Sequence, residues 1–91
     1  NMKIKLKKFG QVLSSRPAGR EAWLTAQAYI LPKTKTAKIE IDFDGVLVLS
    51  PSWADEFITP LRKKYGKIIS FLPNKNSTVK ATLEIIGQKN K

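Results

Sequence analysis

Apolar and charged residues alternate at the start of the chain, where residues 2–7 read Met-Lys-Ile-Lys-Leu-Lys. A period of two is typical of a strand that buries one face. Gly10 permits a turn after this strand, and residues 11–14 can return as a second short strand. The segment therefore predicts an N-terminal β-hairpin whose outer face carries lysines.

A helix is predicted from Pro17 to about Leu31. Proline suits the first position of a helix, so Ser15 or Arg16 is the expected cap. Pro32 is expected to stop the helix, because the residue before a proline disfavours helical dihedral angles. One stripe of the helix is apolar and should face the core. It consists of Ala22, Trp23, Ala26 and Ile30.

The alternation returns in the middle of the chain, where residues 39–44 read Ile-Glu-Ile-Asp-Phe-Asp. A strand covered on both faces should be almost continuously apolar. We therefore expect the acidic face of this strand to lie toward water. If it neighbours the first strand, the lysines at positions 3, 5 and 7 can lie opposite Glu40 and Asp42.

A second helix is predicted from near Ser52, because Trp53, Phe57 and Leu61 recur at spacings of four. Pro60 cannot donate a backbone hydrogen bond within this helix. It therefore predicts a kink or a break.

Residues 67–72 are predicted as a third main strand. Asn76 or Ser77 then caps a last helix that Gly87 ends. Residues 88–91 are expected to form a disordered tail. The buried stripe of this helix is Val79, Leu83 and Ile86.

The order of hairpin, helix, strand, helix, strand and helix predicts an α/β fold. Right-handed crossovers favour a small mixed sheet, built from the hairpin and parallel strands, with about three helices mainly on one face. A length of 91 residues is that of one domain, 1–91. We interpret Asn1, which stands before Met2, as a tag remnant.

Composition excludes several classes of protein. Hydrophobic residues make up 42% and charged residues 26% of the chain, values typical of a globular domain rather than a disordered one. No apolar run is long enough to cross a membrane. The chain has no cysteine and no apolar leader, so we expect a cytoplasmic protein.

The chain is strongly basic, with 17 basic and 7 acidic residues and a formal charge of +10. Such a surface attracts nucleic acid, acidic proteins or anionic lipid. Fourteen of the basic residues are lysines spread along the chain, whereas base reading favours arginine. A nucleic-acid-associated protein that binds without sequence preference is therefore one alternative function.

Four of the seven acidic residues lie within residues 41–56. The segment from Asp42 through Asp44 to Leu47 resembles the first motif of haloacid-dehalogenase-like phosphatases, which implies an aspartate nucleophile. The later acidic pair that holds magnesium in that family is missing, since Glu84 is the only acid beyond Glu56. The chain also has no histidine. We therefore expect a noncatalytic protein with no metal and no cofactor.

Three segments resemble another family, the STAS-like domains of unknown function, which are related to bacterial anti-sigma-factor antagonists. They are residues 13–16, residues 41–46 and, most specifically, residues 49–57, which read Leu-Ser-Pro-Ser-Trp-Ala-Asp-Glu-Phe. The resemblance implies a STAS-like fold and a regulatory interaction with a kinase-like ATPase. Matching strand to strand places the phosphorylated serine of the antagonists on Ser52. Ser50 stands where the antagonists have aspartate, and Trp53 stands where they have glycine.

Helices that follow parallel strands begin at one edge of the sheet, where ligands bind in open α/β sheets. The start of a helix also favours a phosphate. The predicted partner-binding and regulatory residues all come from this edge. They are Arg16, Asp44, Ser50, Ser52, Trp53, Asp55 and Glu56.

Structural roles for the same residues remain open. Ser52 and Asp55 can form a capping box. Arg16 can tie the first helix to a carboxylate, with Asp42, Asp44 and Asp55 as candidates. Trp53 can belong to the core.

Overall fold

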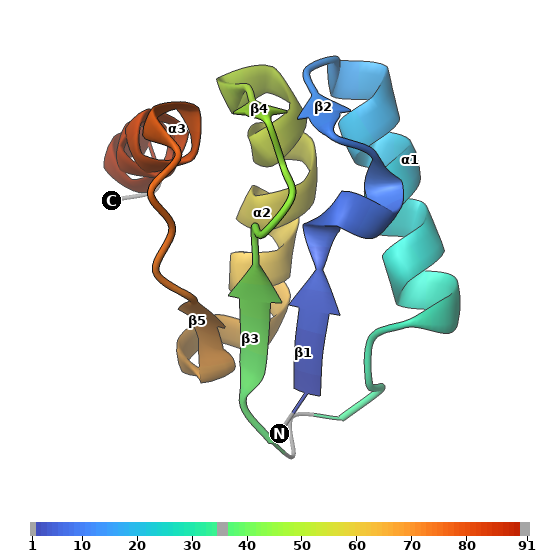
Figure 1. The fold of residues 1–91 in the computed structure, drawn as a ribbon. Coiled ribbons are helices and arrows are strands. Elements are labelled where there is room, and N and C mark those ends of the chain that lie inside the picture. Colours follow the sequence, from blue (N-terminus) through green and yellow to red (C-terminus); the bar gives the residue numbers. More distant parts are fainter. Residues whose placement is uncertain (1, 35–36, 90–91) are drawn as a thin grey trace.

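The computed structural model describes residues 2–34 and 37–89. Strands and helices alternate along the chain (Figure 1). They are β1 (Met2–Lys5), β2 (Val12–Leu13), α1 (Arg16–Tyr29), β3 (Ile39–Asp42), β4 (Val48–Leu49), α2 (Pro51–Tyr65), β5 (Ile69–Phe71) and α3 (Ser77–Lys89), with 3-10 turns at Leu6–Phe9 and Gly66–Ile68. Asn1 and residues 90–91 lie outside the described residues, so what the sequence predicts for them stays a prediction.

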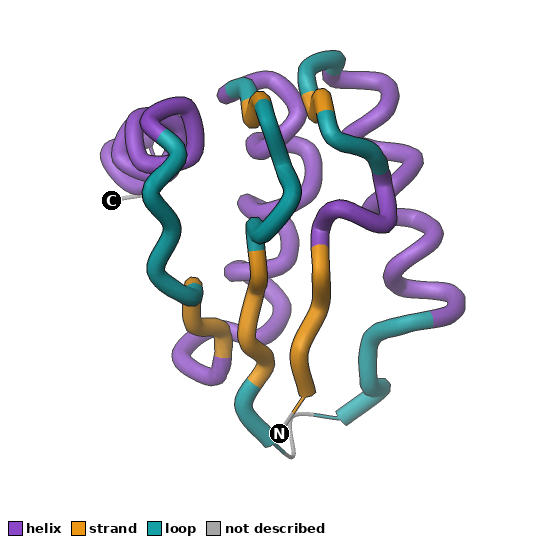
Figure 2. Tube along the Cα trace, in the orientation of Figure 1, coloured by secondary structure: helices purple, strands orange, loops and turns teal. Residues whose placement is uncertain are grey.

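Every strand pairing within residues 2–34 and 37–89 is parallel. One sheet has the order β1-β3-β5, and β2 pairs with β4 in a second, two-stranded sheet. β1 and β2 point the same way and are separated by the Leu6–Phe9 turn (Figure 2). β3 and β4 form a second interrupted strand of this kind beside them. The fold is therefore α/β, as predicted, but its sheets are parallel rather than mixed.

The predicted N-terminal hairpin is wrong. The Gly10 amide donates to the Lys7 carbonyl and closes a helical turn instead of a reversal. Val12 then pairs with Val48, and the Gln11 carbonyl accepts from the Leu47 and Val48 amides. Alternation identified β1 and the turn residue Gly10 suggested β2, but neither signal says which partner each strand takes.

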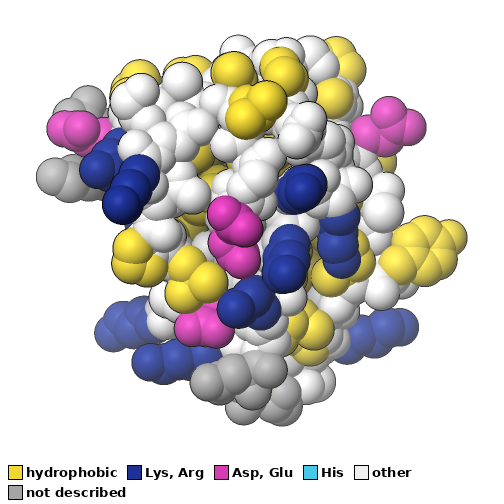
Figure 3. Space-filling model, viewed as in Figure 1, with side chains coloured by type: hydrophobic (Ala, Val, Ile, Leu, Met, Phe, Trp, Pro, Cys, Tyr) yellow, Lys and Arg dark blue, Asp and Glu magenta, His cyan; other side chains and the backbone are white. Residues whose placement is uncertain are grey.

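The sheet buries one face and exposes the other. Residues Ile4, Ile39 and Ile41 are buried, and α1 and α2 lie behind this face (Figure 1). On the outer face Lys3 is in register with Glu40, and Lys5 is in register with Asp42. Basic and acidic side chains gather there (Figure 3). The predicted polar face is therefore confirmed for Lys3 and Lys5, whereas Lys7 lies in the Leu6–Phe9 turn beyond the strand.

Aromatic rings from α1, α2 and the Leu6–Phe9 turn pack together in the core. The Trp53 ring stacks on Phe57, with 5.0 Å between centroids and 24° between planes. The Trp23 and Phe57 rings are T-shaped, with 6.2 Å between centroids, and the Phe9 ring lies 5.4 Å from Phe57. Trp53 is only 1% exposed, so it belongs to the core.

A break of α2 at Pro60 and an end of α3 at Gly87 do not occur. α2 continues through Pro60 to Tyr65 without a break. Ile58 and Leu61 on either side of the proline are fully buried, and this burial outweighs the one hydrogen bond that proline removes. α3 continues past Gly87 to Lys89, so the prediction that Gly87 ends it is wrong. The predicted disordered tail stays a prediction.

Candidate functional site

Two helix starts lie together at the carboxyl ends of β2 and β4. The Ser15 hydroxyl caps α1 by accepting from the Ala18 amide at 3.2 Å. The Ser50 hydroxyl caps α2 by accepting from the Trp53 amide at 3.2 Å. It also donates to the Ser14 carbonyl at 2.6 Å. Ser50 therefore fixes the start of α2 against the turn that leads into α1.

The capping box predicted on Ser52 is wrong. Pro51 takes the first position of α2, so the residue before it is the cap. Ser52 comes second in the helix and is half-buried. Asp55 does not reach back to a cap, because its carboxylate accepts from Thr59 at 2.9 Å and from Arg16. The hydroxyl of Ser52 is thus not needed to begin the helix.

Arg16 joins the two helix starts. One of its terminal nitrogens lies 3.0 Å from the Asp55 carboxylate and 2.6 Å from the Glu56 carboxylate. The hydrogen bonds that it donates to Asp55 and to Glu56 raise the pKa of Arg16 above its usual value. The guanidinium is therefore charged at any physiological pH. Of the carboxylates expected to face Arg16, Asp55 does so, whereas Asp42 and Asp44 do not.

Asp44 lies apart from this cluster. It follows β3, is exposed, and donates its amide to the Asp42 carboxylate at 2.9 Å. Gly45 continues the turn at φ 84°, a conformation that favours glycine. The Asp42 carboxylate thus has a local structural role in this turn. Among residues 2–34 and 37–89, no three acidic side chains come close enough to hold a metal ion.

A polar network at the start of α3 goes beyond the predicted cap on Asn76. The Asn76 side chain accepts from the Thr78 and Val79 amides and donates to the Val46 and Leu47 carbonyls. Asn76 is therefore the cap of α3 and also holds the loop between β3 and β4. The Asn-Ser-Thr cluster in the sequence indicates the start of a helix. It does not indicate that Asn76 also binds the loop between β3 and β4.

Two threonines of α3 form hydrogen bonds with backbone groups at the unpaired edge of β4. The Leu49 amide donates to the Thr78 hydroxyl at 3.1 Å. The Thr82 hydroxyl, which is buried, donates to the Leu49 carbonyl at 2.7 Å. Threonine on the side of a helix that faces the core is the sequence signal for these bonds, and the sequence analysis did not recognise it.

An exposed apolar patch lies beside the helix starts and was also missed. Val12 and Leu47 are each 59% exposed, and Val48 is 38% exposed. Val12 and Val48 are partners in the β2–β4 pairing, and apolar side chains gather over these two strands (Figure 3). We call Val12, Leu47 and Val48 the strand-end patch. Contiguous exposed apolar groups commonly mark interaction surfaces.

Comparison with known proteins identifies the family. A family model described as a STAS-like domain of unknown function matches residues 28–87, which is more than half of the chain. Neither the curated proteins nor the solved structures give a significant match. Within the described residues, no helix has both the length and the apolar character needed to cross a membrane. By its fold and by the matched segment, the chain belongs to the family of STAS-like domains of unknown function.

Proposed function

We propose that the chain is a noncatalytic regulatory module that docks a kinase-like ATPase through the start of α2. The observation that carries this proposal is the position of Ser52. Its hydroxyl is not the helix cap, and it stands in the first turn of α2 beside the strand-end patch. A serine that is not needed for folding can be modified without loss of the fold.

The charges around Ser52 supply a switch. A phosphate in the first turn of α2 is favoured by the helix dipole but repelled by Asp55 and Glu56. Arg16 is bonded to both carboxylates, and a phosphate on Ser52 would compete for the same guanidinium. Phosphorylation would therefore rearrange the surface formed by these four residues.

The other predicted residues have supporting roles in this proposal. Trp53 lies in the core and holds the first turn of α2 from within. Ser50 caps the same helix. Asp44 lines a different hollow. The contact surface that we propose therefore consists of Arg16, Ser52, Asp55 and Glu56, together with the strand-end patch.

Replacing Ser52 by Asp should change the affinity for the partner by about tenfold while leaving the fold intact. The partner would first be captured from the native host after nuclease treatment and identified by mass spectrometry. Isothermal titration would then compare the wild type with Ser52→Asp and Ser52→Ala. Ser77→Asp is the matched control, because Ser77 is exposed in the first turn of α3. Equal affinities for wild type and Ser52→Asp would remove Ser52 from the mechanism.

Replacing Leu47 by Asp should weaken the same complex by about tenfold or more, because a charge would enter the apolar centre of the contact. Leu24→Asp is the control, since Leu24 is similarly exposed, at 50%, but lies on α1. Both variants should keep the thermal midpoint of the wild type. If the two weaken binding equally, the strand-end patch is not part of the contact.

The charge of +10 supports nucleic-acid association as a second candidate function. The nuclease treatment separates the two candidates. Retention of a kinase-like ATPase after nuclease supports docking through α2. Loss of every partner with the nuclease supports the second candidate.

A further inference from the structure

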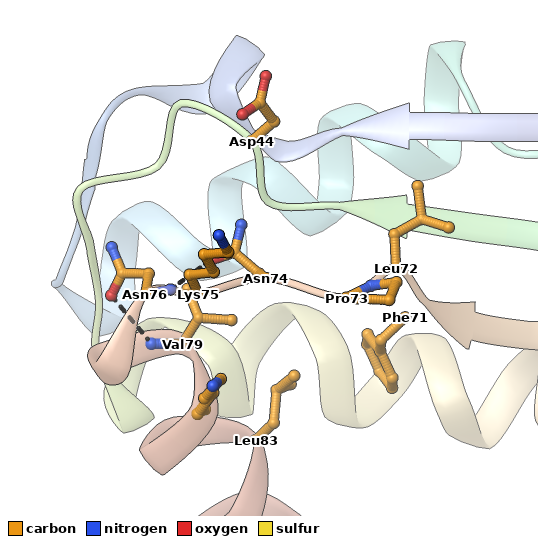
Figure 4. Close-up of a pocket in the computed structure, with 10 residues that line it drawn as sticks. Asp44, Phe71, Leu72, Pro73, Asn74, Lys75, Asn76, Val79 and Leu83 are labelled. Atoms are coloured by element: carbon orange, nitrogen blue, oxygen red, sulfur yellow. Dashed lines mark hydrogen bonds between the residues drawn. The ribbon is translucent and has the colours of Figure 1, made fainter.

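A hollow of about 800 Å³ opens between α3 and the ends of β3 and β5. Phe71, Val79 and Leu83 provide apolar walls, and Lys75, Lys80 and Asp44 carry the charges around it. In Figure 4, Asp44 comes from the loop after β3, on the opposite side from Val79 and Leu83 of α3. The volume is in the range of sites that bind small molecules.

The place of this hollow in the fold is that of a ligand site. β3 and β5 are neighbouring parallel strands, and the hollow lies just beyond their carboxyl ends. Open α/β sheets bind ligands in the crevice at this edge. The hollow is on the side of the molecule where α3 lies, whereas Arg16 and its carboxylates join α1 to α2.

The walls of the hollow are held in place without a ligand. The Phe71 ring stacks on the buried Phe43 ring, with 6.1 Å between centroids and 24° between planes. Val79 is fully buried below the opening. Asn76, which also lines the hollow, is fixed by its bonds to the Val46 and Leu47 carbonyls. A preformed cavity loses less entropy on binding than one that must be ordered.

The charges define the class of ligand. Two lysines and one aspartate are among the residues that line this largely apolar hollow. An anionic group is therefore favoured near the lysines and disfavoured near Asp44. We propose that this hollow binds a small molecule with an apolar body and one anionic group, the apolar part lying against Phe71 and Leu83 and the anion near Lys75 and Lys80. This proposal does not rest on the docking proposed for α2.

The test uses two fluorescent naphthalenes that differ in charge. 1-Anilinonaphthalene-8-sulfonate is anionic, and N-phenyl-1-naphthylamine is its neutral counterpart. We expect saturable binding of one sulfonate per chain, and weaker binding of the neutral dye. Decanoate and naphthyl phosphate would serve as competitors. Displacement by decanoate points to an acyl ligand and displacement by naphthyl phosphate to an aromatic phosphate, and either result supports the site.

Four variants locate the bound dye. Lys80→Glu should weaken sulfonate binding by about fivefold, and Asp44→Asn should strengthen it by about twofold. Leu83→Trp should also weaken it, because the larger ring would occupy part of the space against the apolar wall. Arg20→Glu makes the same change of charge on α1 and should have no effect. Equal weakening by Lys80→Glu and Arg20→Glu, or the absence of saturable binding to a folded wild type, would overturn the proposal.

Discussion

Replacing Gly19 by Ala should destabilise the fold by about 3 kcal/mol, because α1 and α2 are in backbone contact at this residue. A Cβ atom at Gly19 would lie 2.5 Å from the Trp53 carbonyl oxygen and 3.0 Å from its Cα atom. Backbone atoms cannot rotate away, so the two helices would have to separate. Separation would loosen the contact of the Trp23 ring with Phe57 and the contacts that hold Arg16 near Asp55.

Intrinsic helix propensity acts in the opposite direction and is the smaller effect. Alanine is better than glycine inside a helix by about 1 kcal/mol. Gly87 in α3 allows that contribution to be measured alone, since a Cβ atom there would meet nothing within 4 Å. Urea unfolding should therefore show Gly87→Ala to be neutral or slightly more stable than wild type. If Gly19→Ala behaves like Gly87→Ala, the close approach of the helices is not a constraint on stability.

Local patterns in the sequence identify most of the elements but not how they pair. Residues 2–7 and 39–44 indicate their strands by alternation, and their register places Lys3 opposite Glu40 as the charges suggest. The direction of β2 does not follow from alternation, because two residues can pair with any neighbouring edge. Here β4 provides a parallel partner and no reversal is needed. Pairing is a tertiary property, and a period of two carries no information about it.

The start of α2 shows how a cap can be assigned to the wrong serine. Pro51 is well suited to the first position of a helix, which makes Ser50 rather than Ser52 the cap. An ion pair between Arg16 and a carboxylate such as Asp55 was predictable, because both residues follow strands that end at the same edge. The additional bond to Glu56 was not. It depends on the rotation of α2 about its axis, which is set by Trp53 and Phe57 in the core.

The strand-end patch is also difficult to recognise in the sequence. Val46 and Leu49 are buried, whereas Leu47 between them is exposed. A run of consecutive apolar residues reads as uniformly buried, so the exposed members cannot be recognised without the fold. Likewise, nothing in the sequence marks Gly19 as a contact between helices, since an isolated glycine is also tolerated in helices where no neighbour approaches.

Replacing Asn76 by Ala should cost about 3 kcal/mol, the second large effect that we expect. The substitution removes a helix cap, worth about 1 kcal/mol. It also removes donors to the Val46 and Leu47 carbonyls, which lie 3.0 Å and 2.8 Å from the Asn76 amide nitrogen, each worth about 1 kcal/mol. Asn76→Asp keeps the acceptor for the cap but loses the donors, so it should be about 2 kcal/mol less stable than wild type. Chemical unfolding would measure both variants.

Ser77→Ala provides the control at the neighbouring position and should have little effect, because Ser77 is exposed. Equal stability of Asn76→Asp and wild type would show that the bonds to the β3–β4 loop contribute nothing. The order of the three variants therefore separates capping from attachment of the loop.

Asn76 also connects the two sites proposed for this protein. The Thr78 hydroxyl donates to the Asn76 side chain at 2.6 Å and accepts from the Leu49 amide. Leu49 is followed directly by Ser50, the cap of α2. Loss of Asn76 would free Thr78 to rotate and would loosen β4 just before the docking surface. Amide exchange should therefore become faster at Leu49 and Val79 in Asn76→Ala, while the amides of α1 keep their protection relative to global unfolding. Faster exchange confined to Val79 would mean that α3 caps itself through Asn76 but does not hold β4.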